Sequence, residues 1–263
     1  MNPPVSTPAI KVVKSVREQV SAEEWQTRVN LAACYRLVAL YGYTEMIANH
    51  ISCRVPGTHD HFLINPYGML YEEIDASCLI KVDCDGDTLL NPSDYHVNAA
   101  GFVIHSAIHM ARHDVDCVAH THTPAGMAVS AMECGLLPLA QTSMRFLHIA
   151  YHDYEGIALY REEQARMAAD LGKTAKAMIL RNHGLLALGA TVREAFEVMY
   201  YLDTACQIQV DACAGGMENV LLMNDAAAQN TAQQFARDDR PAQHKDWPAL
   251  LRLLDRKGIS YKD

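Results

Sequence analysis

The sequence of 263 residues carries 31 acidic side chains against 22 Lys and Arg, a formal net charge of -9, and 50% of its residues are hydrophobic. This composition excludes a disordered acidic tail and a fibre, and the length suits one large α/β domain with a substantial core. The sequence has neither an apolar run of about 20 residues nor a signal-peptide pattern, so we expect a cytoplasmic protein without a membrane partner. A Lys/Arg stripe is also missing, which argues against a nucleic-acid partner.

The eight cysteines are scattered and include no C-x-x-C pair. We therefore expect free thiols in a reducing compartment, and neither a disulfide framework nor a cysteine metal cluster. The 13 histidines are the other unusual count, and their positions carry the rest of the functional interpretation.

The first half of the chain predicts a helix followed by antiparallel strands. Residues 1–19 contain three prolines and no periodicity, which indicates a mobile N-terminal arm. The main domain is predicted over residues 20–220, and its first helix begins with the capping-box pair Ser21 and Glu24 and stops at Gly42. Short apolar stretches separated by turn residues then predict strands at 50–55, 62–64 and 79–82.

From Ala100 onward the pattern alternates between helices and strands. Helices are expected at 101–112, 123–135, 161–171, 191–214 and 247–254, and strands at 115–120, 176–180 and 185–188. Residues 221–263 are expected to form a C-terminal extension that packs on the domain or on a neighbouring subunit. Because strands and helices interleave, we expect an α/β fold whose central sheet is covered by helices on both faces.

Two histidines stand at the end of a predicted buried strand. His120 and His122 are two residues apart, so their imidazoles project to the same side of the strand. His183 lies in a tight turn between two apolar runs, from where it can reach the same place. Three neutral imidazoles with open coordination positions are typical of a catalytic zinc site. The alternative is that His120 and His122 only form hydrogen bonds at the strand end.

Other histidines have simpler interpretations. Residues 59–61 also read His-x-His, but they follow Pro-Gly-Thr and indicate a solvated turn. His105, His109 and His113 recur every four residues on one helix, without the Glu of a zincin motif. We expect His113 on the surface, and for His105 and His109 either polar packing or a direct role in the site.

Six segments, taken together and in order, resemble the class II aldolase/adducin family, with the adducin head and its bacterial relatives as the nearest branch. The resemblance covers about residues 25–215. The matching segments are Gly42 to Arg54, His61 to Gly68, Ala100 to Ile108, His120 to Gly126, Tyr151 to Tyr154 and Leu180 to Leu185.

The resemblance implies a class II aldolase-like three-layer α/β/α sandwich with a central mixed, mostly antiparallel sheet, assembled as a homotetramer. It also implies a divalent ion on His120, His122 and His183. Zinc is the expected ion, with manganese, cobalt or iron as alternatives. In the family such an ion acts as a Lewis acid that stabilises an enediolate while a carbon–carbon bond is made or broken.

This sequence departs from the family pattern at the substrate. The family glutamate aligns with Gly101, the phosphate-gripping serines align with Ala99 and Ala100, and the phosphate-binding Gly-Asn step aligns with Asn49-His50. The substrate-binding candidates are Asn49, Gly68 and Gly101. With no carboxylate in place, the expected catalytic residues are His50, His105 and His109, joined by Tyr151 from a stretch that in relatives crosses a subunit boundary.

Three functions follow from this pattern. The first is a metal-dependent carbon–carbon lyase, aldolase-like or a decarboxylase, acting on a small unphosphorylated hydroxy-carbonyl or carboxylate substrate. The alternative is a non-catalytic oligomeric binding or scaffold module like the adducin head. A third is an iron oxygenase, because three histidines can also hold Fe(II).

Overall fold

The computed structural model describes residues 15–157, 162–237 and 245–263. Most of the arm expected at 1–19 lies outside these residues, as does Arg161 at the start of one expected helix. Within the described part of that arm, Val16–Gln19 forms the short helix α1. The division of the chain at residues 20 and 220 stays a prediction.

A single sheet of eight strands runs through the molecule in the order β4-β3-β2-β1-β5-β8-β7-β6. All neighbouring strands are antiparallel except β6 and β7, which are parallel. The expected mixed, mostly antiparallel sheet is confirmed. The strands are β1 (His50–Arg54), β2 (His61–Ile64), β3 (Ile80–Asp83), β4 (Thr88–Leu90), β5 (Cys117–Thr121), β6 (Ala150–His152), β7 (Ala177–Leu180) and β8 (Gly184–Gly189).

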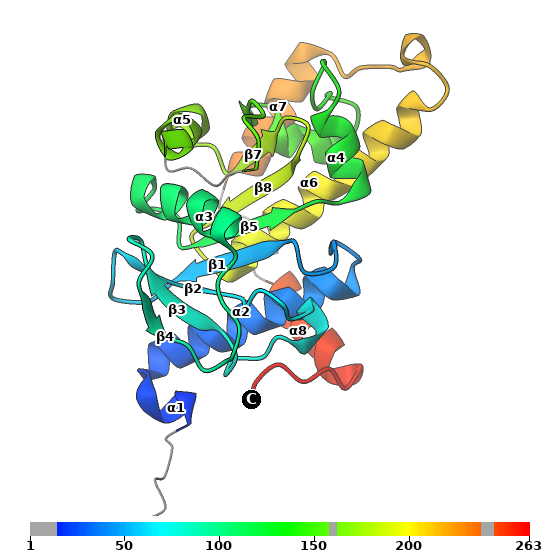
Figure 1. Cartoon of the computed structure of the whole chain (residues 1–263). Coiled ribbons are helices and arrows are strands. Elements are labelled where there is room, and N and C mark those ends of the chain that lie inside the picture. Colours follow the sequence, from blue (N-terminus) through cyan, green and yellow to red (C-terminus); the bar gives the residue numbers. More distant parts are fainter. Residues whose placement is uncertain (1–14, 158–161, 238–244) are drawn as a thin grey trace, which may run out of the picture.

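Helices cover both faces of this sheet, which confirms the three-layer sandwich (Figure 1). One face carries α3 and α5, and the other carries α2, α4, α6 and α8. Their bounds are α2 (Ala22–Leu40), α3 (Ala99–Ala111), α4 (Pro124–Ser130), α5 (Glu162–Leu171), α6 (Val192–Cys213) and α8 (Asp246–Arg256).

Strand alternation divides the buried residues between the two layers. On β1, Ile51 and Cys53 belong to the core under α2 and α6. On β5, Val118 belongs to the core that holds Ile104 and Ile108 of α3. His50 and Ser52 alternate with Ile51 and Cys53, and they meet His105 of α3. The polar side chains at the centre of the sheet therefore face α3.

Helix starts agree with the capping residues read from the sequence. The Ser21, Thr123 and Thr191 side chains each accept a backbone N–H at the start of α2, α4 and α6. The helix expected to reach Gly135 ends earlier, at Ser130, where the backbone oxygen of Ser130 accepts a bond from the N–H of Asn182. That long-range bond replaces a further helical turn.

Several elements were not expected from the sequence. The edge strands β4 and β6 have only three residues each, too few for a visible alternation. The Ala/Gln/Asn-rich stretch forms α7 (Asp225–Ala236), capped by Asn224. Three 3-10 helices complete the described elements: η1 (Tyr71–Glu73), η2 (Gln141–Phe146) and η3 (Met217–Asn219).

The C-terminal residues pack against the body of the same chain. Tyr261 is buried, and the backbone oxygens of Tyr261 and Asp263 accept hydrogen bonds from the N–H groups of Ala76 and Ser77. All eight cysteines are free thiols, as expected. Among the described residues, no helix is long and apolar enough to cross a membrane.

Candidate metal centre

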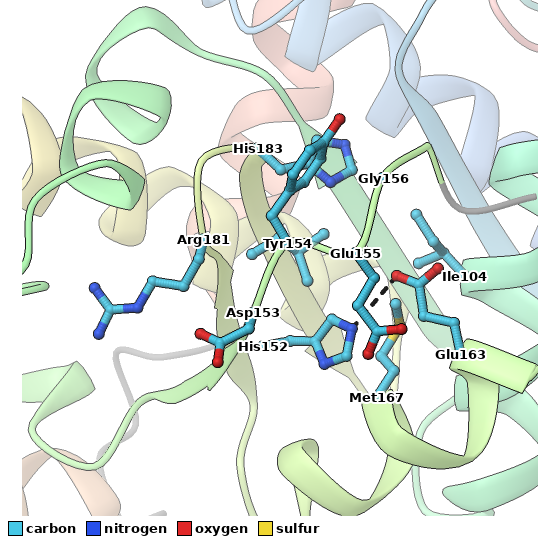
Figure 2. A pocket seen from close by; sticks show the side chains of 11 residues that line it. Ile104, His152, Asp153, Tyr154, Glu155, Gly156, Glu163, Met167, Arg181 and His183 are labelled. Carbon is cyan, nitrogen blue, oxygen red and sulfur yellow. Dashed lines mark hydrogen bonds and ion pairs between the residues drawn. The ribbon is translucent and has the colours of Figure 1, made fainter.

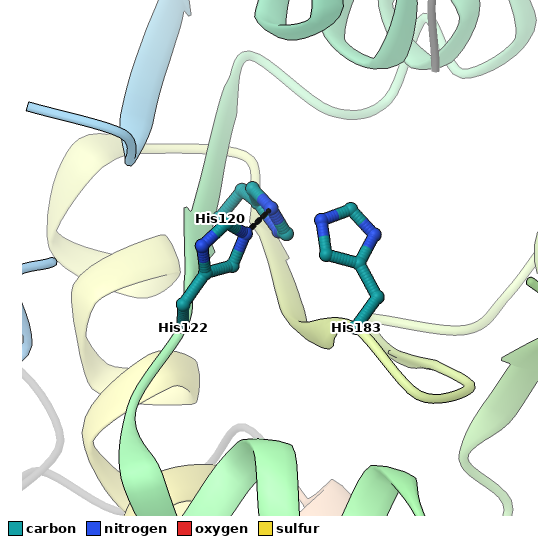
Figure 3. Close-up of side chains that lie close together, drawn as sticks. All are labelled: His120, His122 and His183. Atoms are coloured by element: carbon teal, nitrogen blue, oxygen red, sulfur yellow. Dashed lines mark hydrogen bonds between the residues drawn. The ribbon is translucent and has the colours of Figure 1, made fainter. Parts of the chain in front are cut away.

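Three histidines converge at one end of the central strands. The possible ligand atoms of His120, His122 and His183 all lie within 4.8 Å of one another, and they form the only such group of three or more among the described residues. Figure 3 shows the three rings turned toward a common point, and the Nε2 atoms of His120 and His122 are 2.7 Å apart. The structure brings together the three residues that the sequence nominated.

Local geometry explains why these side chains meet. His120 lies in β5, directly opposite His50 of β1, and His122 follows at the strand end. His183 sits in the tight turn between β7 and β8, after Asn182, whose backbone is left-handed with φ 53°. Asn tolerates this conformation better than most residues do. The turn thereby presents His183 to the end of β5.

Two of the three imidazoles have a fixed tautomer. Nδ1 of His120 donates to the backbone oxygen of Leu185 at 2.9 Å. Nδ1 of His122 lies 2.5 Å from Oε2 of Glu45, which can only accept. When both rings are neutral and both Nδ1 atoms are protonated, both Nε2 atoms carry lone pairs that point at each other across 2.7 Å. A cation between them removes this repulsion, so the residues fit a divalent metal ion.

The electrostatics of the group keep His120 and His183 neutral. Burial, reinforced by His50, His183 and His122, holds the pKa of His120 well below its usual value. Burial and the neighbouring His122 lower the pKa of His183 to about 4. Both rings therefore offer lone pairs at neutral pH, as metal ligands must.

A second set of polar side chains continues from the centre into the layer between sheet and α3. Nδ1 of His50 is 2.7 Å from Nε2 of His105, and the other ring nitrogen of His105 contacts the hydroxyl of Ser52. The same hydroxyl is 2.8 Å from Nε2 of His109. All four side chains are buried, and the ring of His50 stacks on that of His120 with centroids 4.9 Å apart.

Two of the expected substrate-binding residues lie beside this set. A Cβ added to Gly101 would lie 2.6 Å from Cδ2 of His50, so the imidazole occupies the space of a side chain at position 101. Asn49 is buried, and its Oδ1 accepts the N–H of Glu45 at 2.6 Å. Its Nδ2 is buried without a hydrogen-bond partner. Such a donor is available to a ligand.

The other expected site residues have contacts elsewhere. Gly68 has φ 125° and packs against the ring of Tyr95. The hydroxyl of Tyr151 accepts the N–H of Leu136 at 3.0 Å, and its ring lies under the guanidinium of Arg181. These contacts are those of packing residues, and no contact joins either residue to the three histidines within the described part of the chain. The roles predicted for Gly68 and Tyr151 stay predictions.

A small pocket adjoins His183 on the β6 side of the centre (Figure 2). Tyr154, which is 54% exposed, places its ring 6.3 Å from that of His183, centroid to centroid. Deeper in the pocket, His152 pairs through its two nitrogens with Asp170 at 2.7 Å and Glu163 at 3.4 Å. Both nitrogens of His152 are thus engaged, and Tyr154 is the pocket residue whose ring lies beside that of His183.

Three residues of the centre were missed by the sequence interpretation. Glu45 precedes His122 by 77 positions, and no spacing connects the two. Ser52 alternates with buried residues on β1 and resembles a packing residue, and Tyr154 was noted only as part of a longer matching segment. In the His-x-His at 59–61, His59 and Asp60 are exposed as expected, whereas His61 is half-buried and begins strand β2 instead of lying in the turn.

Comparison with known proteins assigns the family. Residues 29–210 match the model of the Class II Aldolase and Adducin N-terminal domain. The chain therefore belongs to the class II aldolase/adducin family, and the resemblance read from the sequence is confirmed.

Relatives come from both branches of the family. A Pseudomonas aeruginosa protein, provisionally named an aldolase class 2 protein, is 50% identical over 251 residues, which cover 94% of this chain and 96% of that protein. Rat alpha-adducin is 43% identical over 243 residues, covering 88% of this chain but only 33% of the adducin.

Solved structures show the same fold. The crystal structure of an aldolase II superfamily protein from Pseudomonas syringae superposes with a TM-score of 0.91 at 47% identity, covering 95% of this chain and 100% of that one. L-fuculose 1-phosphate aldolase from Glaciozyma antarctica gives a TM-score of 0.80 at 28% identity, covering 100% of this chain and 97% of the other.

Proposed function

We propose that this protein is a metal-dependent carbon–carbon lyase, aldolase-like or a decarboxylase, that acts on a small unphosphorylated hydroxy-carbonyl or carboxylate substrate. The observation that carries the proposal is the convergence of His120, His122 and His183, with Nε2 lone pairs fixed on two of them. Family membership supports the same class of reaction at a coarse level.

The ligand set favours zinc among the divalent ions. Neutral imidazoles suit Zn²⁺, and three protein ligands leave a coordination position for substrate. A bound divalent ion supplies Lewis-acid stabilisation of the negative charge that develops on a substrate oxygen. The protein contributes the orientation: Leu185 and Glu45 hold two of the ligand rings in place.

Side chains around the centre have distinct roles in this proposal. The free Nδ2 of Asn49 donates a hydrogen bond to substrate, and His50, stacked on His120, is the acid–base or donor group nearest the ligands. Tyr154 covers the side of the site at His183. Its exposure leaves room for a neighbouring subunit, in keeping with the homotetramer proposed from the family resemblance.

The start of α3 supports an unphosphorylated substrate. Ala99 and Ala100 carry no hydroxyl donor, and the side chain of Asn98 already accepts the N–H groups of Ala100 and Gly101 at 3.0 Å and 3.4 Å. A phosphate there would have to displace Asn98 to reach these two amides. The first turn of the helix is therefore closed by its own cap.

A non-catalytic scaffold module is the second candidate, favoured by the 43% identity to alpha-adducin. The two functions are separated by turnover of zinc-, manganese- or cobalt-loaded protein on a panel of unphosphorylated hydroxy-ketoacids and hydroxy-aldehydes. The lyase proposal predicts cleavage or decarboxylation of at least one member, lost in His122→Ala and kept in the exposed control His96→Ala. A fully metallated wild type with no turnover on the whole panel would contradict the lyase and favour the scaffold.

A further inference from the structure

The hydrogen bonds behind the metal centre form one continuous chain, and one end of this chain is a buried ring nitrogen without a hydrogen-bond partner. From the centre inward they join His50, His105, Ser52 and His109. At the far end, Nδ1 of His109 is buried and has no hydrogen-bond partner. At the end next to the metal centre, Nδ1 of His50 is hydrogen-bonded to His105, so Nε2 is the nitrogen of His50 that lies outside the chain. Each neutral imidazole and the hydroxyl has one proton to donate, so all bonds in the chain run in one direction.

The surroundings of His109 decide that direction. Phe62 stacks on its ring, and within the described part of the chain nothing accepts a proton from Nδ1. A guanidinium nitrogen of Arg54 donates to the backbone oxygen of His109 at 2.7 Å, and Nδ1, which is bonded to Cγ, is the ring nitrogen closer along the side chain to this positive charge. A lone pair is stable beside a positive charge, whereas a buried N–H there lacks an acceptor and is repelled. Nδ1 of His109 therefore carries the lone pair and Nε2 the proton.

The remaining protons follow from this end of the chain. His109 donates from Nε2 to the oxygen of Ser52, and Ser52 donates its hydroxyl proton to Nδ1 of His105. His105 then donates from Nε2 to Nδ1 of His50. The only proton of the neutral His50 ring is left on Nε2.

We infer that the chain of hydrogen bonds holds the proton of His50 on Nε2, so that His50 serves as a fixed hydrogen-bond donor to an anionic oxygen of the substrate and not as a metal ligand or a resting base. Ser52, His105 and His109 are positioning residues that set this tautomer. The ligand chemistry is that of a carboxylate, alkoxide or enolate oxygen. This inference rests on the proposed function for its catalytic meaning and deepens it by assigning the proton on His50.

The geometry agrees with a donor. His50 is buried, its ring stacks on that of His120, and its Nδ1 is bonded to His105, so Nε2 is the ring nitrogen left for a ligand. At the far end of the chain, burial and nearby Arg54 lower the pKa of His109 to about 3, so that ring is uncharged at neutral pH. A preorganised donor that faces a developing oxyanion costs no reorganisation during the reaction, and removing one lowers kcat by about 10²- to 10³-fold in other enzymes.

The direct test is a long-range ¹H–¹⁵N correlation spectrum of histidine-labelled full-length protein at pH 7.5, metal-free and zinc-loaded, with assignment through a His50→Gln variant. The expected spectrum shows His50 protonated on Nε2 and bare on Nδ1 in both states. On zinc loading, the Nε2 resonances of His120 and His122 shift while Nε2 of His50 keeps its proton. A His50 ring protonated on Nδ1, or one whose Nε2 loses its proton to zinc, would overturn the inference.

Substitution of Ser52 separates positioning from structure. In Ser52→Ala the link between His109 and His105 is lost, and we expect the His50 tautomer to become mixed. The matched control is Ser106→Ala on α3, the helix that carries His105 and His109, because Ser106 donates to the backbone of Phe102 and has no bond to the chain of histidines. Ser52→Cys, which keeps a donor and acceptor, should restore part of the wild-type tautomer. An unchanged His50 tautomer in a folded Ser52→Ala protein would contradict the positioning role.

This readout is independent of the proposed function. If the tautomer is as expected but the protein neither binds metal nor turns over any substrate, the lyase proposal fails and the assignment of the proton stands. If the metal-loaded protein is active but His50 is protonated on Nδ1, the donor inference fails and the lyase proposal stands. Where activity is found, Ser52→Ala should lower kcat about tenfold or more with little change in KM, because the donor acts on the developing charge.

Discussion

The buried histidines predict a steep loss of stability in acid. Burial lowers the folded-state pKa of His50, His105, His109 and His120 below the unfolded value of about 6.5. The unfolded chain therefore binds more protons than the folded chain once the pH falls below about 6.5. The stabilising contribution of these four neutral imidazoles is complete above about pH 6.5. It is lost progressively as the pH falls toward the folded-state pKa of each ring, which is about 3 for His109.

The size of the effect follows from the number of groups. Because the unfolded imidazole is half protonated at pH 6.5, each group costs about 1 kcal/mol between pH 6.5 and pH 5.5, so these four cost roughly 4 kcal/mol. His183, whose folded pKa is about 4, adds up to about 1 kcal/mol. A domain is typically stable by only about 5 to 15 kcal/mol. We therefore expect metal-free protein to lose most of its stability near pH 5, whereas metal-loaded protein should resist unfolding in the same window.

Urea unfolding followed by circular dichroism at pH 7.5, 6.5 and 5.5, with a chelator present, measures this dependence. Replacing His109 by Gln should reduce the fall in unfolding free energy below pH 6.5 by about one fifth, since His183 titrates in the same window as the four fully buried groups. His113→Gln is the control, because His113 is exposed just beyond the same helix. A fall that is unchanged in His109→Gln, or a stability that rises on acidification, would refute the reasoning.

Further predictions concern the centre and its supports. Glu45→Gln should weaken zinc affinity about 10- to 100-fold in a competition titration with a chelating dye, because the substitution weakens the bond that orients His122. The control is Glu72→Gln, because Glu72 is exposed and its replacement should leave the zinc affinity unchanged. Equal zinc affinities for Glu45→Gln and the wild type would exclude this role of Glu45. Gly101→Ala should displace the His50 ring and lower turnover without lowering metal content, since its Cβ would lie 2.6 Å from Cδ2 of His50. Gly184→Ala should lower the free energy of unfolding measured in urea by about 1 to 3 kcal/mol, because the added Cβ would lie 2.6 Å from the backbone oxygen of Thr121. Gly215→Ala is the control, because the space around Gly215 is open. Wild-type stability in Gly184→Ala, or metal loss in Gly101→Ala, would contradict these two assignments.

Much of the fold could be predicted from local chemistry. Ser21, Thr123 and Thr191 each mark a helix start because a capping side chain acts within its own turn. The pairing of His120 with His122 followed from strand alternation, which needs only neighbouring residues. The third ligand, His183, was found because its turn lies between two strongly apolar runs.

The rest of the site depends on long-range contacts. The hydrogen bond of His122 to Glu45 and the bonds of Ser52 to His105 and His109 join segments 53 to 77 positions apart. Periodicity places each residue on a face of its own element but does not say which element packs against that face. His50, His105 and His109 could thus be nominated as a set, whereas their order in one hydrogen-bonded chain required the structure.

The metal content of the purified protein tests the central claim most directly. Protein prepared without chelators and loaded with zinc, manganese or cobalt should retain about one ion per chain by mass spectrometry of its metals, since the three histidines form one site. His122→Ala should retain less than about a tenth of that amount, and His96→Ala should match the wild type. A folded wild-type protein that holds none of these ions after loading would contradict the account.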